Sequence, residues 1–346
     1  MKQYLDLVKY TLENGDYQIN ERTQEGCTGV TGTTLKWDLR KTYPAVTTKE
    51  LFYKSAFGET IGFLQGKTNA ADFRALGSKV WDQNANETPA WLANAFRKGV
   101  DDLGNIYGDQ WRNWPGFKFI HEDKVEENEA AEKAGYTFID RVLTNVHWEI
   151  GGDGKKEYHN LWYKSIDQVK EVITKIIKNP TDRRILFHAW NPAMLDQMAL
   201  PPCHLLYQFI PKIGTRDGKP YREMDLVVYI RSWDLFLGAP FNMAATAMML
   251  HLFSMLTGFR ARHLTIQGGD VHIYDKHLDA VNTQLEREPL EAPKLMVDAS
   301  VRVFDPKASD DENIEQALLT IERLKKDDFV LVNYNHHEKI SAPMAK

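Results

Sequence analysis

Two cysteines are the only thiols in the 346-residue sequence, and one of them lies in a context that suits nucleophilic chemistry. Cys203 follows two prolines and precedes His204, and a thiol becomes a strong nucleophile when cationic neighbours favour its thiolate form. Cys27 has no such neighbours and is interpreted as a buried structural thiol. Because a lone cysteine at the start of a strand is usually a core residue, this pattern alone assigns no reaction.

Arginines at two places could bind a phosphate group. Arg183 and Arg184 follow a predicted helix and precede a predicted strand, and Arg231 with Ser232 ends another predicted strand. A guanidinium group binds phosphate oxygens through two hydrogen bonds, and a serine hydroxyl adds a further donor. A pair of arginines by itself is most often a solvated surface feature.

Further segments give these residues a common interpretation. They are Gly58–Gly66, Trp81-Asp82 followed by Tyr107–Arg112, Arg231–Asn242 and Gly268–Tyr274. Together with Pro202-Cys203-His204, and in this order, they resemble the thymidylate synthase family, which includes the dUMP and dCMP hydroxymethylases. The resemblance runs from Met1 to about Lys294 and returns at Ile340–Ala345.

The resemblance implies a fold and an assembly. It predicts an α+β (mixed α/β) fold of three layers, whose large mixed sheet forms the interface of a homodimer. Residues 1–346 would be one catalytic domain, with polar insertions near 86–100 and 118–164. The substrates would be dUMP and 5,10-methylenetetrahydrofolate as one-carbon donor, and no metal is implied.

The family's reaction assigns catalytic roles by position. A nucleophile must add to C6 of uracil before C5 can attack an electrophilic carbon, and Cys203 matches that nucleophile. Glu59 matches the carboxylate that organises proton transfer, and Tyr107 the tyrosine that assists loss of the C5 proton. The residues expected to act in catalysis are Cys203, Glu59, Tyr107, Asn242, Asp234 and His204.

The binding residues follow in the same way. Asn242 matches the residue that reads the pyrimidine edge, where its carboxamide can pair with both N3–H and O4 of uracil. The dCMP-specific relatives have an aspartate at this place, so the resemblance favours dUMP over dCMP. Arg183 and Arg184 are expected to reach the other subunit's site. The substrate-binding set is Arg22, Arg183, Arg184, Arg231, Ser232, Asn242, His272 and Tyr274. The folate-binding set is Lys49, Val80, Trp81, Leu200, Asp234, Leu237, Gly238, Phe241 and Ala345.

Four departures from the family pattern leave the product open. Asn84 and Gly62 stand where the family has tryptophans, Ile230 where it has glutamine, and the chain ends in Met344-Ala345-Lys346. A site that excludes water would give dTMP and dihydrofolate, whereas a wetter site would give 5-hydroxymethyl-dUMP and tetrahydrofolate. A third alternative is a non-catalytic binding protein on the same fold.

The apolar patterns predict helices and strands in mixed order. Helices are expected at 4–12, from Thr47 or Thr48 to 64, and at 166–177, 241–257, 276–287 and 310–326. Strands are expected at 31–39, 185–190, 204–210, 225–231 and 263–267. The stretches 88–99 and 118–157 are more polar and less periodic, and 151–154 is read as a turn.

Composition limits the classes of partner and the compartment. The formal net charge of −5 gives no support to nucleic-acid binding, which calls for a basic face. The start of the sequence does not read as a signal peptide, and the apolar run 239–256 contains Asn242 and His251 and so reads as a buried helix rather than a membrane span. With two cysteines only, the reducing cytoplasm is the expected compartment.

Overall fold

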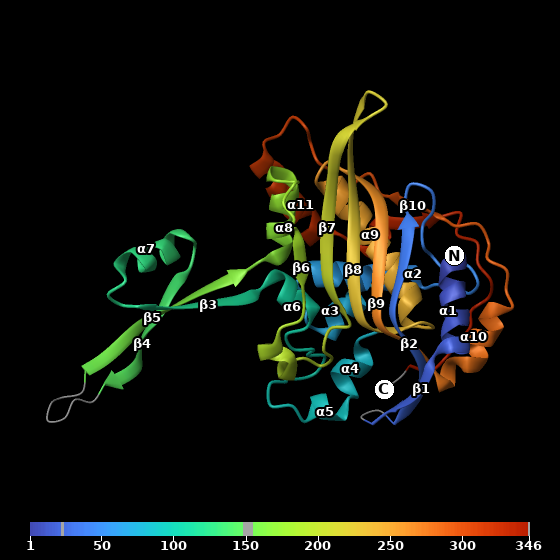
Figure 1. The fold of residues 1–346 in the computed structure, drawn as a ribbon, viewed down its shortest axis with the longest axis horizontal. Coiled ribbons are helices and arrows are strands. Elements are labelled where there is room, and N and C mark those ends of the chain that lie inside the picture. The colour runs from blue at the N-terminus through green and yellow to red at the C-terminus, as the bar shows by residue number, and fades with distance from the viewer. Residues whose placement is uncertain (22–23, 148–154, 345–346) are drawn as a thin grey trace.

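A six-stranded mixed sheet forms the centre of the molecule (Figure 1). The structure, a computed structural model, describes residues 1–21, 24–147 and 155–344. The strand order is β1 (Asp16–Asn20), β2 (Glu25–Asp38), β9 (Arg260–Tyr274), β8 (Lys219–Asp234), β7 (His204–Arg216) and β6 (Leu186–His188). β8 and β9 run parallel and the other pairs antiparallel, so the predicted mixed sheet is confirmed.

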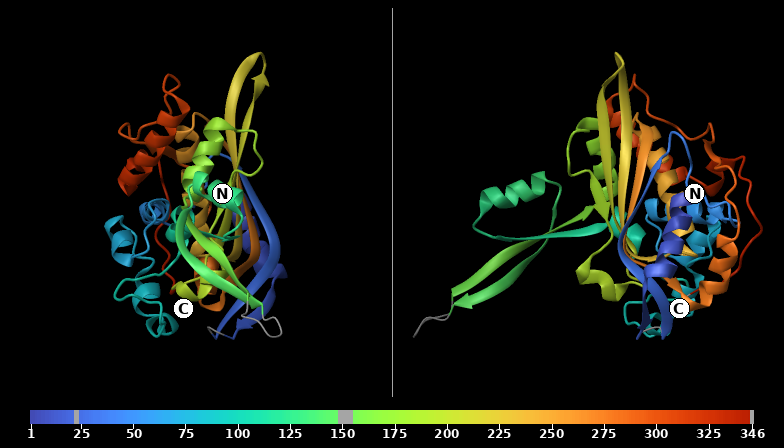
Figure 2. Two further views of the ribbon diagram at one scale, coloured as in Figure 1. Left: turned by 90° about the vertical axis from the view of Figure 1, so that its left-hand side faces the viewer. Right: turned by 45° about the vertical axis from the view of Figure 1, so that its right-hand side comes forward.

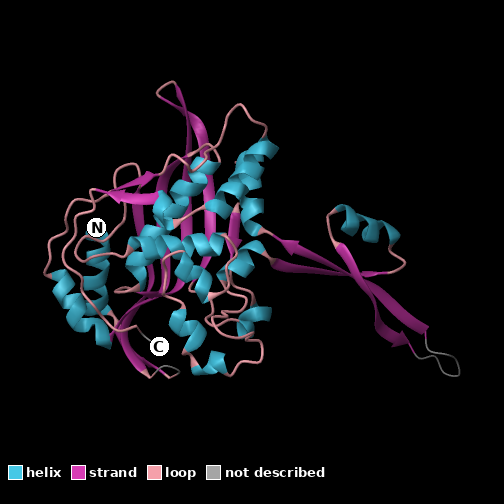
Figure 3. Cartoon of the chain, turned by 180° about the vertical axis from the view of Figure 1, so that it is seen from behind, coloured by secondary structure: helices cyan, strands magenta, loops and turns pink. Residues whose placement is uncertain are grey.

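Two helices stack behind this sheet and complete three layers. α9 (Gly238–Leu256) packs on β8 and β9, and α2 (Tyr53–Leu64) packs on α9. These helices lie behind the sheet in Figure 1 and in front of it in Figure 3. By length and composition α9 could cross a membrane, but 78% of the qualifying stretch is buried, as in a core helix.

The remaining elements of the body surround these layers. The helices are α1 (Lys2–Asn14), α3 (Ala70–Ala75), α4 (Asp82–Asn86), α5 (Pro89–Leu92), α6 (Tyr107–Arg112), α8 (Gln168–Lys178), α10 (Leu278–Leu285) and α11 (Asp310–Arg323). Short 3₁₀ turns occupy η1 (Pro192–Gln197), η2 (Asp275–His277) and η3 (Lys326–Asp328), and β10 (Lys294–Val297) pairs with β11 (Phe329–Val332).

The helix expected to start at Thr47 or Thr48 begins instead at Tyr53, so that boundary was wrong. The two hydroxyls are buried and bind distant segments rather than capping a helix. The Thr47 hydroxyl accepts from the backbone N–H of Leu290 (3.0 Å), and that of Thr48 accepts from the Gln284 amide (2.9 Å). Tertiary contacts therefore outcompete the local capping signal.

The second polar stretch forms an arm that projects from the body near β6 and α8, called here the projecting module (Figures 1 and 2). It consists of β3 (Trp114–His121), α7 (Val125–Lys133), β4 (Thr137–His147) and β5 (Lys155–Ile166), in sheet order β3-β5-β4. Its own small core is Ile120, Ala131 and Trp162. The sequence did not predict these strands, and the expected turn at 151–154 lies outside the described residues.

Candidate active site

Cys203 ends the loop that leads into β7, and Arg231 on the neighbouring β8 holds that loop. The Arg231 backbone N–H donates to the Cys203 carbonyl (2.8 Å). Its guanidinium donates to the carbonyls of Pro202 (2.7 Å) and Pro201 (3.0 Å), and Nη2 lies 3.9 Å from the Cys203 Sγ. One arginine therefore both positions the thiol and places positive charge beside it.

Burial and charge act on the thiol in opposite directions. Burial raises the pKa of Cys203, the Arg231 guanidinium opposes this, and the Glu59 carboxylate adds to it, so the pKa lies above its ordinary value. Arg231 by itself is therefore not enough positive charge to favour the thiolate in a single chain.

His204 does not supply the charge that its place beside Cys203 suggested. Burial lowers the pKa of His204 to about 3, so its imidazole is neutral near pH 7. The ring stacks on Tyr107 with centroids 4.2 Å apart, and its Nδ1 lies 2.8 Å from the Tyr207 hydroxyl. The expectation of a cationic His204 was wrong, because the residue points into an aromatic cluster.

A carboxyl group and a phenol from two helices lie near Cys203. Glu59 on α2 accepts a hydrogen bond from the Trp81 indole N–H (2.9 Å). Burial raises the pKa of Glu59 to about 7, although the Trp81 bond lowers it. The Tyr107 hydroxyl, at the start of α6, accepts from the Cys203 backbone N–H (2.6 Å) and keeps its own hydrogen to donate elsewhere.

The parallel pairing of β8 and β9 brings the predicted nucleotide-binding residues to one end of the sheet. Ser232 is in register with Asp270, and Asp234 with His272. The His272 Nδ1 lies 2.9 Å from an Asp270 carboxylate oxygen, and the His272 ring contacts Tyr274, with centroids 4.8 Å apart. Asn242 lies in the first turns of α9, which follows β8 directly.

The turn after β8 is fixed by hydrogen bonds that leave the Asp234 carboxylate with capacity to accept more. Asp234 accepts from the Phe236 amide at 2.9 Å and from the Leu237 amide at 3.3–3.4 Å. Tyr4 donates to the Leu235 carbonyl (2.8 Å). A carboxylate has about four acceptor positions. Asp234 can therefore pair with the N–H groups of a pterin ring.

Lys49 lies inside this arrangement and not at the surface where a glutamyl tail would meet it. The side chain is buried, and Nζ donates to the Phe236 carbonyl (2.6 Å) from 3.4 Å above the Phe236 ring. Burial lowers the pKa of Lys49 to about 7, against the attraction of Asp234. In this structure Lys49 supports the turn after Asp234.

An apolar surface continues from this turn. Trp81 is buried, and the others pack on the core while staying partly exposed: Val80, Leu200, Leu237 and Phe241. Gly238 begins α9 beside them. Partly exposed apolar side chains that pack on the core are typical of the lining of a ligand pocket. In the described part of the chain, no three His, Cys, Asp or Glu side chains come together as metal ligands would.

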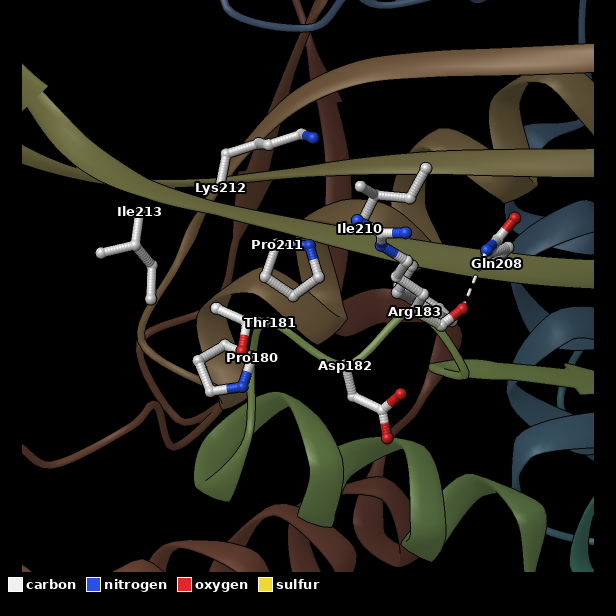
Figure 4. A pocket seen from close by; sticks show the side chains of 10 residues that line it. Pro180, Thr181, Asp182, Arg183, Gln208, Ile210, Pro211, Lys212 and Ile213 are labelled. Atoms are coloured by element: carbon white, nitrogen blue, oxygen red, sulfur yellow. Dashed lines mark hydrogen bonds between the residues drawn. The ribbon is translucent and has the colours of Figure 1, made fainter.

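The structure does not bring Arg183 and Arg184 to Cys203. The Arg183 carbonyl accepts from Gln208 (3.2 Å), which lies four residues into β7, about 13 Å along the strand from His204. Arg184 is exposed and pairs with Asp182 (3.0 Å). Arg183 lines a hollow of about 470 Å³ with residues 180–182 and 208–213 (Figure 4). None of the residues expected to act in catalysis lines this hollow. Arg22 and Ala345 lie outside the described residues.

The structure also explains two of the departures from the family pattern, at Gly62 and Ile230. It adds one residue, His277, that the sequence did not signal. A Cβ atom at Gly62 would lie 2.5 Å from Cε1 of Phe73, so α3 occupies the space of the missing tryptophan. Ile230 is fully buried in the core face of β8. His277 is fully buried, with Nδ1 3.6 Å from the Asp234 carboxylate. Nothing in the sequence around His277 pointed to this contact.

Comparison with known proteins identifies the family of the chain. The family model described as thymidylate synthase matches residues 2–346. Thymidylate synthases of Pseudomonas putida and Bordetella parapertussis are 48% and 44% identical over 345 residues, covering 100% of both chains in each case. The thymidylate synthase of enterobacteria phage T4 is 35% identical over 352 residues, again over 100% of both chains. The chain therefore belongs to the thymidylate synthase family, whose members are methyltransferases with methylenetetrahydrofolate as co-substrate.

Proposed function

We propose that this protein methylates dUMP at C5 with 5,10-methylenetetrahydrofolate, giving dTMP and dihydrofolate. The observation that carries the proposal is the convergence of Cys203, Arg231 and Tyr107 beside the Glu59 carboxyl group. The relatives described above are all named as synthases, which favours methylation over hydroxymethylation. A nucleophile kept together with its acid–base groups also argues against a binding-only role.

In the proposed reaction the Cys203 sulfur forms a bond to C6 of uracil, and C5 gains the electron density to attack. The folate supplies an electrophilic carbon and then a hydride, which together account for the new methyl group. The C5 proton leaves before the bond from sulfur to C6 breaks, and Tyr107 is placed to direct the water that accepts it. Cys203 is thereby regenerated.

Glu59 would transfer protons on the O4 side of the uracil ring. With a pKa of about 7, it exchanges a proton readily at neutral pH, which suits transfer to uracil O4 and to the departing folate nitrogen. Trp81 fixes its orientation. Asn242 would read the N3–H and O4 edge, and His272 and Tyr274 the sugar 3′-hydroxyl.

Phosphate binding requires a second subunit in this proposal. Arg22, Arg231 and Ser232 would hold the phosphate from one chain, and Arg183 and Arg184 from its partner. Two features support this: the pair lies far from its own Cys203, and the sheet face opposite α9 exposes the large side chain of Tyr229. On that face, Val227 and Tyr229 of β8 point away from the core, because Leu226 and Val228 point into it.

We assign the cytoplasm as the compartment, since Cys27 and Cys203 are both free thiols. The reaction itself is tested by trapping with 5-fluoro-dUMP and methylenetetrahydrofolate, read by the mass of the intact chain. We expect an adduct on the wild type and on Cys27→Ser, and none on Cys203→Ser. An adduct on Cys203→Ser, or none on the wild type, would refute the proposal.

A second assay identifies the product. It follows the absorbance of dihydrofolate, and mass spectrometry gives the mass of the nucleotide formed. Methylation gives dTMP and one dihydrofolate for each nucleotide. A product heavier by one oxygen atom, without dihydrofolate, would identify the hydroxymethylase alternative instead.

Shared sites are tested by subunit mixing. Cys203→Ser and Arg184→Glu chains should each be almost inactive alone. In a mixture, half of the dimers carry one site with an intact cysteine and intact partner arginines, so about a quarter of wild-type activity should return. Absence of recovery, with dimers present by light scattering, would place the arginines outside the site.

A further inference from the structure

His204 and Tyr207 lie on the same face of β7, although they are three positions apart. Side chains of a regular strand alternate, so residues at this spacing should point to opposite faces. His204 pairs with Ile230 on β8, and a register shift follows at Leu206. Tyr207 then pairs with Val228, which lies two positions from Ile230 rather than three. The extra residue is a β-bulge, and since Ile230 and Val228 are both buried, it turns both side chains to the core face.

The bulge brings the polar groups of these two residues into contact. The Tyr207 hydroxyl lies 2.8 Å from Nδ1 of His204, and the two rings meet edge to face with centroids 5.8 Å apart. The hydroxyl has one hydrogen to place, and no other described residue accepts it. The phenol keeps this hydrogen, because burial raises the pKa of Tyr207 well above its ordinary value. Tyr207 is therefore the donor and Nδ1 the acceptor.

This hydrogen bond fixes the hydrogen of the His204 imidazole on Nε2. The ring is neutral, because burial lowers its pKa to about 3, and a neutral imidazole carries one hydrogen. An accepting Nδ1 leaves that hydrogen on the other nitrogen. Nε2 has no hydrogen-bond partner among the described residues, and it is not one of the buried polar atoms that lack one. The Nε2–H group therefore reaches open space and can donate to a molecule that enters it.

The other neighbours of the His204 ring are either buried aromatic rings or part of the catalytic set. The rings of Phe63 and Trp111 are buried, with centroids 6.0 and 6.4 Å from that of His204. Tyr107 stacks on His204 at 4.2 Å, and its hydroxyl accepts from the Cys203 backbone N–H at 2.6 Å. Cys203 also precedes His204 directly in the chain. A ligand that reaches the thiol would thus lie close to this ring.

We propose that Tyr207 is a positioning residue that fixes His204 as a neutral hydrogen-bond donor to the ligand of Cys203. The inference rests on the proposed function, because that ligand is the uracil ring of dUMP. When the sulfur adds to C6, negative charge develops on a ring oxygen, and a donor that is already in place stabilises it. Without the Tyr207 hydroxyl, the hydrogen can move to Nδ1, and Nε2 would then offer an acceptor instead of a donor.

Nuclear magnetic resonance of protein with isotope-labelled histidine tests the tautomer without any ligand. The His204 signals are assigned by their loss in His204→Gln. We expect the hydrogen on Nε2 in the wild type and a shifted Nδ1 signal in Tyr207→Phe. The matched control is Tyr43→Phe, which also removes one buried hydroxyl, bonded to the Ala244 carbonyl at 2.7 Å beside the ring of His251. This control should leave the His204 signals unchanged.

The rate of adduct formation with saturating 5-fluoro-dUMP and methylenetetrahydrofolate tests the role in the reaction. We expect Tyr207→Phe to lower this rate about two- to tenfold, the effect of one hydrogen bond, and Tyr43→Phe to keep it within about twofold of the wild type. His204→Asn should be at least as slow as Tyr207→Phe, because its short amide reaches only the place of Nδ1. The longer amide of His204→Gln reaches the place of Nε2 and always donates, so Tyr207→Phe should have no further effect in that background.

The two measurements separate this inference from the proposed function. A wild type that forms no adduct would refute the proposed function, while the resonance signals still decide the tautomer. A hydrogen on Nδ1 in the wild type, or an Nδ1 signal that Tyr207→Phe leaves unchanged, would show that Tyr207 does not fix the tautomer. If Tyr207→Phe forms the adduct at the wild-type rate, or slows it equally in the His204→Gln background, Tyr207 does not act through His204.

Discussion

Burial moves the pKa of two site residues toward neutrality from opposite sides. The pKa of Glu59 rises to about 7 and that of Lys49 falls to about 7, in each case because the charged form loses its hydration. Each group is therefore near the point at which it gains or loses a proton under ordinary conditions. For Glu59 this is useful in catalysis, and it also has a cost in stability that can be measured.

The loss of stability that comes from burying the Glu59 carboxylate predicts how Glu59→Gln changes stability with pH. The folded chain keeps the Glu59 proton up to about pH 7, whereas the unfolded chain loses it near 4.5. Between these values the folded state binds more protons, so this group lowers stability as pH rises. We expect Glu59→Gln to raise the free energy of unfolding by up to about 3 kcal/mol at pH 8 and by nothing at pH 4.

Urea unfolding at pH 4, 6 and 8 checks this expectation. The control is Glu132→Gln on α7, an exposed carboxyl group in the projecting module. If Glu59→Gln raises the free energy of unfolding equally at all three pH values, burial does not shift the pKa of Glu59.

At the scale of elements, α2 and α3 meet where the family pattern has a tryptophan. Gly62 lets Phe73 approach α2, and a Cβ atom would lie 2.5 Å from Cε1 and 2.8 Å from Cδ1 of its ring. Alanine in place of glycine improves a helix by about 1 kcal/mol. Forced overlap in a packed core costs about 1–3 kcal/mol. The clash should outweigh the helical gain.

We therefore expect Gly62→Ala to lower the free energy of unfolding by about 1 kcal/mol, and Gly62→Trp to lower it further. The matched control is Gly238→Ala at the start of α9, where a Cβ atom meets nothing closer than 3.6 Å. Thermal unfolding of the three variants gives the answer. Stabilisation by Gly62→Ala would mean that Phe73 moves freely.

Elements with a strong apolar period were predictable, and those specified by distant contacts were not. α8 buries Val169, Ile173 and Ile176 on one face and was expected within two residues. The start of α2 was missed because the Thr47 and Thr48 hydroxyls bind segments more than 200 residues away. In the same way, motif order predicted the approach of Cys203 to Arg231, but only the fold revealed the neutral His204 and the contact of His277.

At the scale of the whole molecule, we propose one catalytic domain that carries the projecting module as an insertion. The cluster of Ile120, Ala131 and Trp162 is separate from the main core. α7 is tied to its own sheet, since the Asn128 side chain accepts from Asn160 and Trp162 at 2.9 Å. The module leaves the body along β3 and returns along β5 (Figure 2).

This separation predicts that the module can be removed without loss of the chemistry. Gly116 and Lys164 are paired across β3 and β5, so an Asn-Gly turn can replace residues 117–163 and keep the ends of both strands. Trp114, which packs on His188 of the body with ring centroids 4.8 Å apart, is retained. We expect the shortened chain to form the 5-fluoro-dUMP adduct at a rate within about threefold of the wild type, since the deleted hydrophobic cluster is not part of the main core. Trapping kinetics and the dimer mass by light scattering are the measurements. A folded, dimeric variant that forms no adduct would show that the module belongs to the catalytic unit and would refute its description as an insertion.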